Sequence, residues 1–67
     1  MALEEELLQQ GFRPNGPHDM QDLPEALGLM INEHRQNIRE VRIIPGAEAR
    51  EDMKDYPNLF MVYLKVD

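Results

Sequence analysis

Residues 59–66, which read Leu-Phe-Met-Val-Tyr-Leu-Lys-Val, are the most informative stretch of this sequence. Successive side chains of a β-strand point to opposite faces, so alternate residues share a face. One face of this stretch carries Phe60, Val62, Leu64 and Val66, and the other carries Leu59, Met61 and Tyr63. Because a strand with one solvated face alternates apolar with polar residues, this pattern predicts a strand that is covered on both faces or lies inside a sheet.

A second strand is predicted at residues 39–44, where two apolar residues, Val41 and Ile43, alternate with charged ones and a Pro-Gly pair follows. Two strands make too small a sheet to stand alone. We therefore expect the sheet to be completed by edge-to-edge pairing with a second copy of the chain. Such pairing would also cover the surplus apolar face of residues 59–66.

Residues 46–57 connect the two strands and leave two structures open. They are polar but rich in helix-forming residues, and Ala49, Met53 and Tyr56 recur at a helical spacing. A short helix and a loose charged loop both fit this segment. We expect the two strands to be antiparallel, and the strand order depends on which structure the segment adopts.

The clearest helix is predicted at residues 23–37. The run Asp-Leu-Pro-Glu at residues 22–25 matches a capping box, in which Asp22 accepts a hydrogen bond from a free backbone N–H and Glu25 reaches back. The residues that share one face of this helix are Leu23, Ala26, Leu27, Met30, Ile31, His34 and Ile38. The pattern predicts an amphipathic helix with one continuous buried face.

A shorter helix is predicted at residues 2–10, which carry a narrow stripe of leucines. Gly11 suits the left-handed residue that ends a helix, and Phe12 would then fold back on Leu7. Residues 13–19 hold two prolines around an Asn-Gly pair. They are predicted to form a surface turn that connects the two helices.

Together these elements predict an α+β fold: two N-terminal helices followed by two β-strands (ααββ), with a short helix between the strands as an option. The 67 residues form a single small domain, residues 1–67. A domain of this size buries only about 60% of the surface of its unfolded chain, and it has no cysteine for disulfides. Association is then the expected source of further stability, which favours a homodimer.

The residue types exclude several kinds of chemistry. The sequence contains no Ser, Thr or Cys, so no hydroxyl of Ser or Thr and no thiol can act as a nucleophile. His18, Asp19 and Asp22 have the composition of a metal or acid–base site, but turn and cap chemistry explains them better. His34 fits a boundary position near a helix end better than a pH switch. We expect no catalytic, cofactor-binding or metal-binding residues, and a protein that is not an enzyme.

The formal net charge is −6. Such a charge repels nucleic-acid phosphates and favours a protein partner with a basic surface. The N-terminus lacks the cationic start and apolar core of a signal peptide. The longest apolar run, residues 59–64, is far shorter than the about 20 residues that span a bilayer. We expect a soluble cytoplasmic protein that does not act at membranes.

Leu59, Met61 and Tyr63 are the predicted interface, because methionine and tyrosine are enriched in the cores of protein interfaces. The alternative is that the N-terminal helix covers this face from within the same chain. The interface interpretation leads to a small interaction or regulatory protein, homodimeric, that acts by binding another protein.

Arg35, Arg39 and Arg42 form a second candidate site at the end of the longer helix and the start of the next strand. Guanidinium groups bind phosphates or carboxylates through paired hydrogen bonds. Glu33 and Glu40 are interspersed, and no aromatic residue is present here for base stacking. A nucleic-acid-associated regulator is therefore the alternative function, while ion pairs or a protein contact fit these arginines better.

Overall fold

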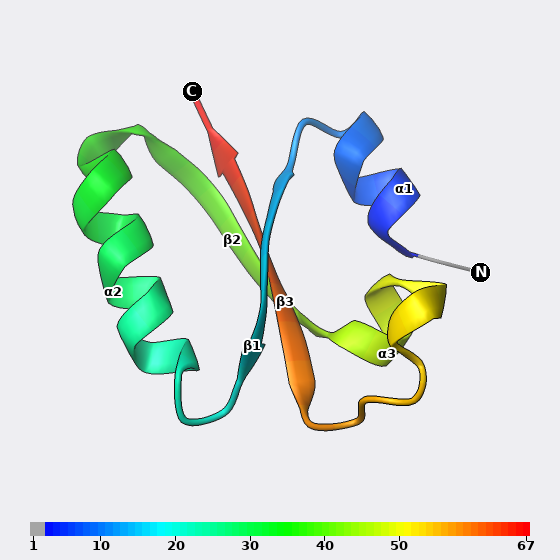
Figure 1. Ribbon diagram of the computed structural model, residues 1–67. Helices are drawn as coiled ribbons and strands as arrows, with labels where there is room; N and C mark the ends of the chain where they lie inside the picture. Colours follow the sequence, from blue (N-terminus) through cyan, green and yellow to red (C-terminus); the bar gives the residue numbers. More distant parts are fainter. Residues whose placement is uncertain (1–2) are drawn as a thin grey trace.

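Strand β3 (Leu59–Val66) is the middle strand of a three-stranded sheet with the order β1-β3-β2 (Figure 1). The computed structural model describes residues 3–67, except the side chain of Gln36. β3 pairs antiparallel with both of its neighbours. Met61, Val62 and Tyr63 have the largest fully buried side chains of the described residues. The prediction that this strand is covered on both faces is confirmed.

The predicted order of elements, ααββ, is wrong. Helices and strands alternate along the chain as α1, β1, α2, β2, α3 and β3. β1 is Arg13–Asp19, which the sequence predicted as a connecting turn. The third strand of the sheet thus comes from the chain itself and not from a second copy.

The turn signals in β1 have a different role from the one that we predicted. Pro14 and Pro17 are tolerated because β1 is an edge strand, where a missing N–H need not break the ladder. Gly16, with φ of +138°, lies at an irregularity in the pairing with β3. A Cβ atom there would lie 3.2 Å from the carbonyl oxygen of Phe60, so glycine permits the close approach of the two strands. Pairing with β3 thus outweighs the local preference of residues 13–19 for a turn.

β2 (Ile38–Pro45) pairs with the other edge of β3 and is one residue longer at each end than predicted. Its pairing is irregular near Arg39 and then continuous from Glu40 to Pro45. The expected antiparallel arrangement of these two strands is confirmed. β1 and β2 therefore form the two outer edges of the sheet.

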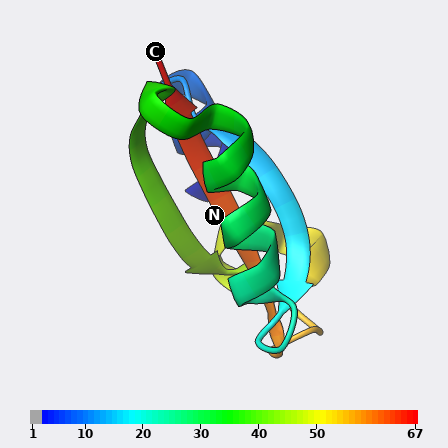
Figure 2. The same cartoon turned by 90° about the vertical axis from the view of Figure 1, so that its left-hand side faces the viewer.

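α2 (Leu23–His34) lies on one face of the sheet (Figure 2) and continues into a 3₁₀ turn, η1 (Arg35–Asn37). The regular helix thus ends three residues before the predicted end. Met30 is buried, as its place on the apolar face requires. Ile31, which we predicted on the same buried face, is 53% exposed.

α1 (Leu3–Gln9), α3 (Gly46–Ala49) and a 3₁₀ turn, η2 (Glu51–Met53), lie on the opposite face (Figure 1). The helical option for the segment between the last two strands is therefore the one that the chain adopts. Residue 2, where the predicted first helix begins, lies outside the described residues, as does residue 1.

α1 ends in the way that its sequence predicts. Gly11 has φ of +99°, and its N–H donates to the carbonyl oxygen of Leu8 at 3.1 Å. The N–H of Phe12 donates to the carbonyl oxygen of Leu7 at 3.0 Å. This pair of hydrogen bonds is a Schellman motif, and it turns Phe12 back toward the core.

The main core lies between the sheet and the face that carries α1 and α3. Its buried side chains are Leu7, Phe12, Ala49, Met53, Met61 and Tyr63. Val62 and Leu64, which alternate with these β3 residues, are buried on the other face, beneath α2. A sheet of three strands is thus covered by helices on both sides.

Candidate functional site: the open edge of strand β2

The predicted interface residues lie inside the main core. Met61 is 1% exposed, Tyr63 is 0% exposed, and Leu59 is half-buried at the margin of the same cluster. Helices α1 and α3 of the same chain cover them, which is the alternative that the sequence left open. While these helices stay in place, the three side chains offer little surface to a second molecule.

Tyr63 belongs to a polar network beneath α1. Its hydroxyl donates a hydrogen bond to Glu4 Oε2 at 2.7 Å, and Arg50 Nε lies 3.9 Å from Glu4 Oε1. Burial, and after it the hydrogen bond and charge of Glu4, raise the pKa of Tyr63 above its usual range. The hydrogen bond from the neutral hydroxyl of Tyr63 to Glu4 links β3 to α1, so this network has a structural role.

The three arginines of the second candidate site do not form one open cationic surface. Arg39 and Arg42 each pair with a carboxylate at 2.7 Å, that of Asp67 and that of Glu40 respectively. Arg35, after the last residue of α2, donates a hydrogen bond to a backbone carbonyl of its own helix. Two of the three charges are thus matched within the chain. Nucleic-acid binding stays a prediction that no observation here favours.

The histidines and their neighbours have local partners. His18 Nε2 is hydrogen-bonded to Asn15 Oδ1 at 2.7 Å. The carboxylate of Asp19 accepts a hydrogen bond from the N–H of Asp22 at 2.8 Å, whereas Asp22 makes no side-chain cap, so the predicted capping box is not formed. His34 is half-buried. Across residues 3–67, no three His, Asp or Glu side chains are grouped so that they could hold a metal ion.

The two outer edges of the sheet differ. β1 carries Pro14 and Pro17 and has an irregular pairing, and both features hinder the addition of another strand. β2 has no proline before Pro45, and residues 40–45 are in continuous register with β3. Within residues 3–67 no strand pairs with the outer edge of β2. Alternate backbone N–H and C=O groups of β2 therefore face away from the sheet.

The α2 side of β2 is open and apolar. Figure 2 shows α2 beside β1 and across β3, with β2 standing apart from it. Val41 and Ile43 lie on this side of β2, and Ile43 is 45% exposed. Glu33 lines a hollow beside β1, and Ile31, two residues earlier, lies on the opposite flank of the helix. Ile31 is thus exposed on the flank of α2 that lies away from β1.

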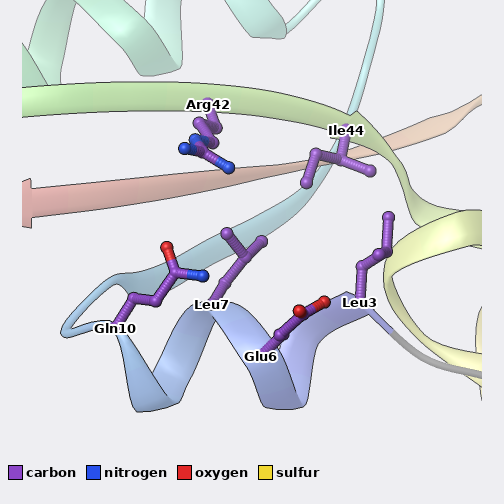
Figure 3. A pocket seen from close by; sticks show the side chains of 6 residues that line it. All are labelled: Leu3, Glu6, Leu7, Gln10, Arg42 and Ile44. Atoms are coloured by element: carbon purple, nitrogen blue, oxygen red, sulfur yellow. The ribbon is translucent and has the colours of Figure 1, made fainter.

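A hollow of about 170 Å³ lies on the other side of β2, between this strand and α1 (Figure 3). Side chains from both elements face each other across it: Leu3, Glu6, Leu7, Gln10, Arg42 and Ile44. Its apolar end is formed by Leu3 and Ile44, and its polar end by Gln10 and Arg42. The guanidinium of Arg42 lies 5.2 Å from the ring centre of Phe12, which holds it in place through a cation–π contact.

We call this surface the β2 edge: the backbone of residues 40–45, the side chains of Ile31, Val41 and Ile43, and the hollow beside α1. An extended segment can add to such an edge through backbone hydrogen bonds. Its alternate side chains would then lie against Ile43 on one side and in the hollow on the other.

The sequence predicted edge-to-edge pairing with a second copy, but it placed the interface at Leu59, Met61 and Tyr63 and not at the outer edge of β2. The signal is the contrast between two prolines in residues 13–19 and none in residues 39–44. It has meaning only when residues 13–19 are known to be the opposite edge of the same sheet.

No family model, curated protein or solved structure matches this chain. In the part of the chain that the structure describes, no helix combines the length and apolar character needed to cross a membrane.

Proposed function

We propose that this protein is a non-enzymatic interaction protein that binds an extended segment of protein along the β2 edge. The bound segment becomes a strand beside β2 and hydrogen-bonds to its backbone. The observation that carries the proposal is the contrast between the edges of the sheet: prolines hinder pairing at β1, whereas residues 40–45 of β2 are in regular register with β3 and, among the described residues, have no strand on their outer side.

The flanking side chains supply the selectivity of this edge. Ile43 and Ile31 offer apolar contacts on the α2 side, and the hollow beside α1 receives side chains on the other. Charges along β2 are mixed, with Arg39 and Arg42 around Glu40. The net charge of −6 attracts basic proteins at long range, but contact at β2 favours a segment that carries charges of both signs.

A peptide selection tests the proposal. Random peptides displayed on phage are selected on the immobilised full chain, and enriched peptides are synthesised and titrated by fluorescence anisotropy. Two variants are compared: Ile43→Lys at the β2 edge, and Leu29→Lys on the flank of α2 that is turned away from β2. Leu29 is the more exposed of the two, at 64% against 45%. We expect Ile43→Lys to weaken binding about tenfold or more, and Leu29→Lys to leave it unchanged.

Hydrogen exchange then shows whether the bound peptide forms a strand. In the dilute free chain, the outward amides of β2 should exchange quickly, and the peptide should protect them. Peptides that bind both variants equally and leave these amides unprotected would show that the β2 edge is not the binding site.

A further inference from the structure

We infer that the segment bound at the β2 edge is β2 of a second copy of this chain; the inference rests on the proposed function. Two β2 strands that pair antiparallel about a two-fold axis join the two sheets into one, with the order β1-β3-β2-β2-β3-β1. The order of charges along β2 selects this partner and sets its register.

A two-fold axis perpendicular to the sheet keeps each side chain on its own face. Residues that face each other across an antiparallel pair also share a face, so the axis must lie next to one residue of β2, and that residue faces the same residue of the other copy. Centred on Glu40, the pairing sets two carboxylates opposite each other, and centred on Arg42 it sets two guanidinium groups opposite each other. Centred on Val41, it sets Glu40 of each copy opposite Arg42 of the other, so the ion pair that Glu40 and Arg42 make within each chain at 2.7 Å joins a network of four alternating charges. Opposite charges in facing positions stabilise a strand pair, and like charges destabilise it.

The alternative centre at Ile43 is less favourable. It places Arg42 opposite Ile44 and Val41 opposite Pro45, so no charge finds an opposite charge. In the Val41 register, Val41 faces its own copy, and Ile43 of each copy faces Arg39 of the other copy, at the irregular start of β2. Exposed apolar surface is thereby removed from both copies at once.

The blocked edge explains why this association ends at two copies. In the joined sheet, both outer strands are β1, which carries Pro14 and Pro17. These edges resist the addition of further strands. The β2 pairing is self-complementary and closed, so it produces a dimer and not a fibre.

A charge-swap cycle tests the register. The Kd of self-association is measured by sedimentation velocity across a concentration series at 0.15 M salt, where charges more than about 8 Å apart are screened. The chains compared are the wild type, Glu40→Arg, Arg42→Glu and the double variant. Each single change sets like charges opposite each other at two symmetric positions and also breaks the Glu40–Arg42 pair within each chain; the double variant restores the pairs of both kinds.

We expect each single variant to weaken the dimer about tenfold or more, and the double variant to return within about threefold of the wild type. Glu48→Arg and Lys54→Glu are matched controls, since both residues are exposed and change the net charge by the same amounts. These controls should leave the Kd unchanged. Circular dichroism checks that each variant is folded. Arg42 also contacts Phe12, so Arg42→Glu could unfold the chain; in that case the Kd of Glu40→Arg alone is compared with the wild type.

The outcomes separate this inference from the proposed function. A wild-type chain that stays monomeric at all concentrations overturns the inference. A dimer whose Kd is insensitive to the charge swaps overturns it as well, because association then uses another surface. In either case, selected peptides that still protect the β2 amides keep the proposed function. Peptides that leave those amides unprotected end the proposed function independently.

Discussion

Replacing Leu7 with alanine tests whether helix α1 of the same chain shelters the apolar face of β3. Leu7 is 4% exposed and packs in the core with Met61 and Tyr63, whereas its neighbour Leu8 is 45% exposed. A buried leucine truncated to alanine costs about 2–5 kcal/mol. The core of so small a domain supplies only about 3–5 kcal/mol of net stability. We therefore expect Leu7→Ala to remove most of the free energy of unfolding, and Leu8→Ala to cost less than about 0.5 kcal/mol.

Urea unfolding followed by circular dichroism measures both variants. With a slope of about 1 kcal/mol per molar urea for a small domain, Leu7→Ala should lower the midpoint by about 2 M or leave the chain largely unfolded without urea. The adjacent control has the same chemistry in the same helix, so helix propensity is matched between the two. Equal and small effects of both changes would refute the reasoning, because the face of Met61 and Tyr63 would then be covered by something other than α1.

Three further changes test other parts of the structure. Tyr63→Phe should cost about 1–3 kcal/mol by removing the hydrogen bond to Glu4, as measured by urea unfolding. Because burial raises the pKa of Tyr63, the unfolded chain loses the hydroxyl proton near pH 10 while the folded chain keeps it. The free energy of unfolding should therefore be unaffected by this group below pH 10 and should fall above it. In Tyr63→Phe this fall should be absent. Gly46→Ala should cost about 1–3 kcal/mol in thermal unfolding, because the new Cβ would meet Met53 Cε and lie 3.2 Å from a backbone oxygen. Gly28→Ala, with nothing within 4 Å of the new atom, should instead raise stability by about 0.5–1 kcal/mol by favouring the helix; a loss of stability there would contradict the open placement of this glycine.

Features that depend on neighbouring residues were predictable. The end of α1 at Gly11 follows from one glycine and one aromatic residue, and both hydrogen bonds of the Schellman motif are present. The two apolar faces of β3 follow from the period of two along residues 59–66. The buried stripe of α2 was correct at Met30 and wrong at Ile31, because α2 lies across β1 and β3 and leaves the flank next to β2 uncovered.

The candidate site was not predictable, because it is a property of the sheet as a whole. Whether a strand is an edge depends on which other strands exist, and the identity of β1 was hidden by two prolines and an Asn-Gly pair. The strand propensities of residue types span only about 1 kcal/mol, which the pairing of β1 with the buried β3 outweighs.

From the chain alone, then, one could know that residues 59–66 must be covered on both faces, because apolar side chains alternate on each. What covers them was settled by packing: α1 and α3 on one face and α2 on the other, all from the same chain. β1, which carries two prolines, pairs with one edge of β3. β2 pairs with the other edge of β3, and its own outer edge stays open. The apolar periodicity of residues 59–66 predicts only that these side chains are buried. Any neighbouring element or molecule could bury them, and only the three-dimensional structure shows which one does.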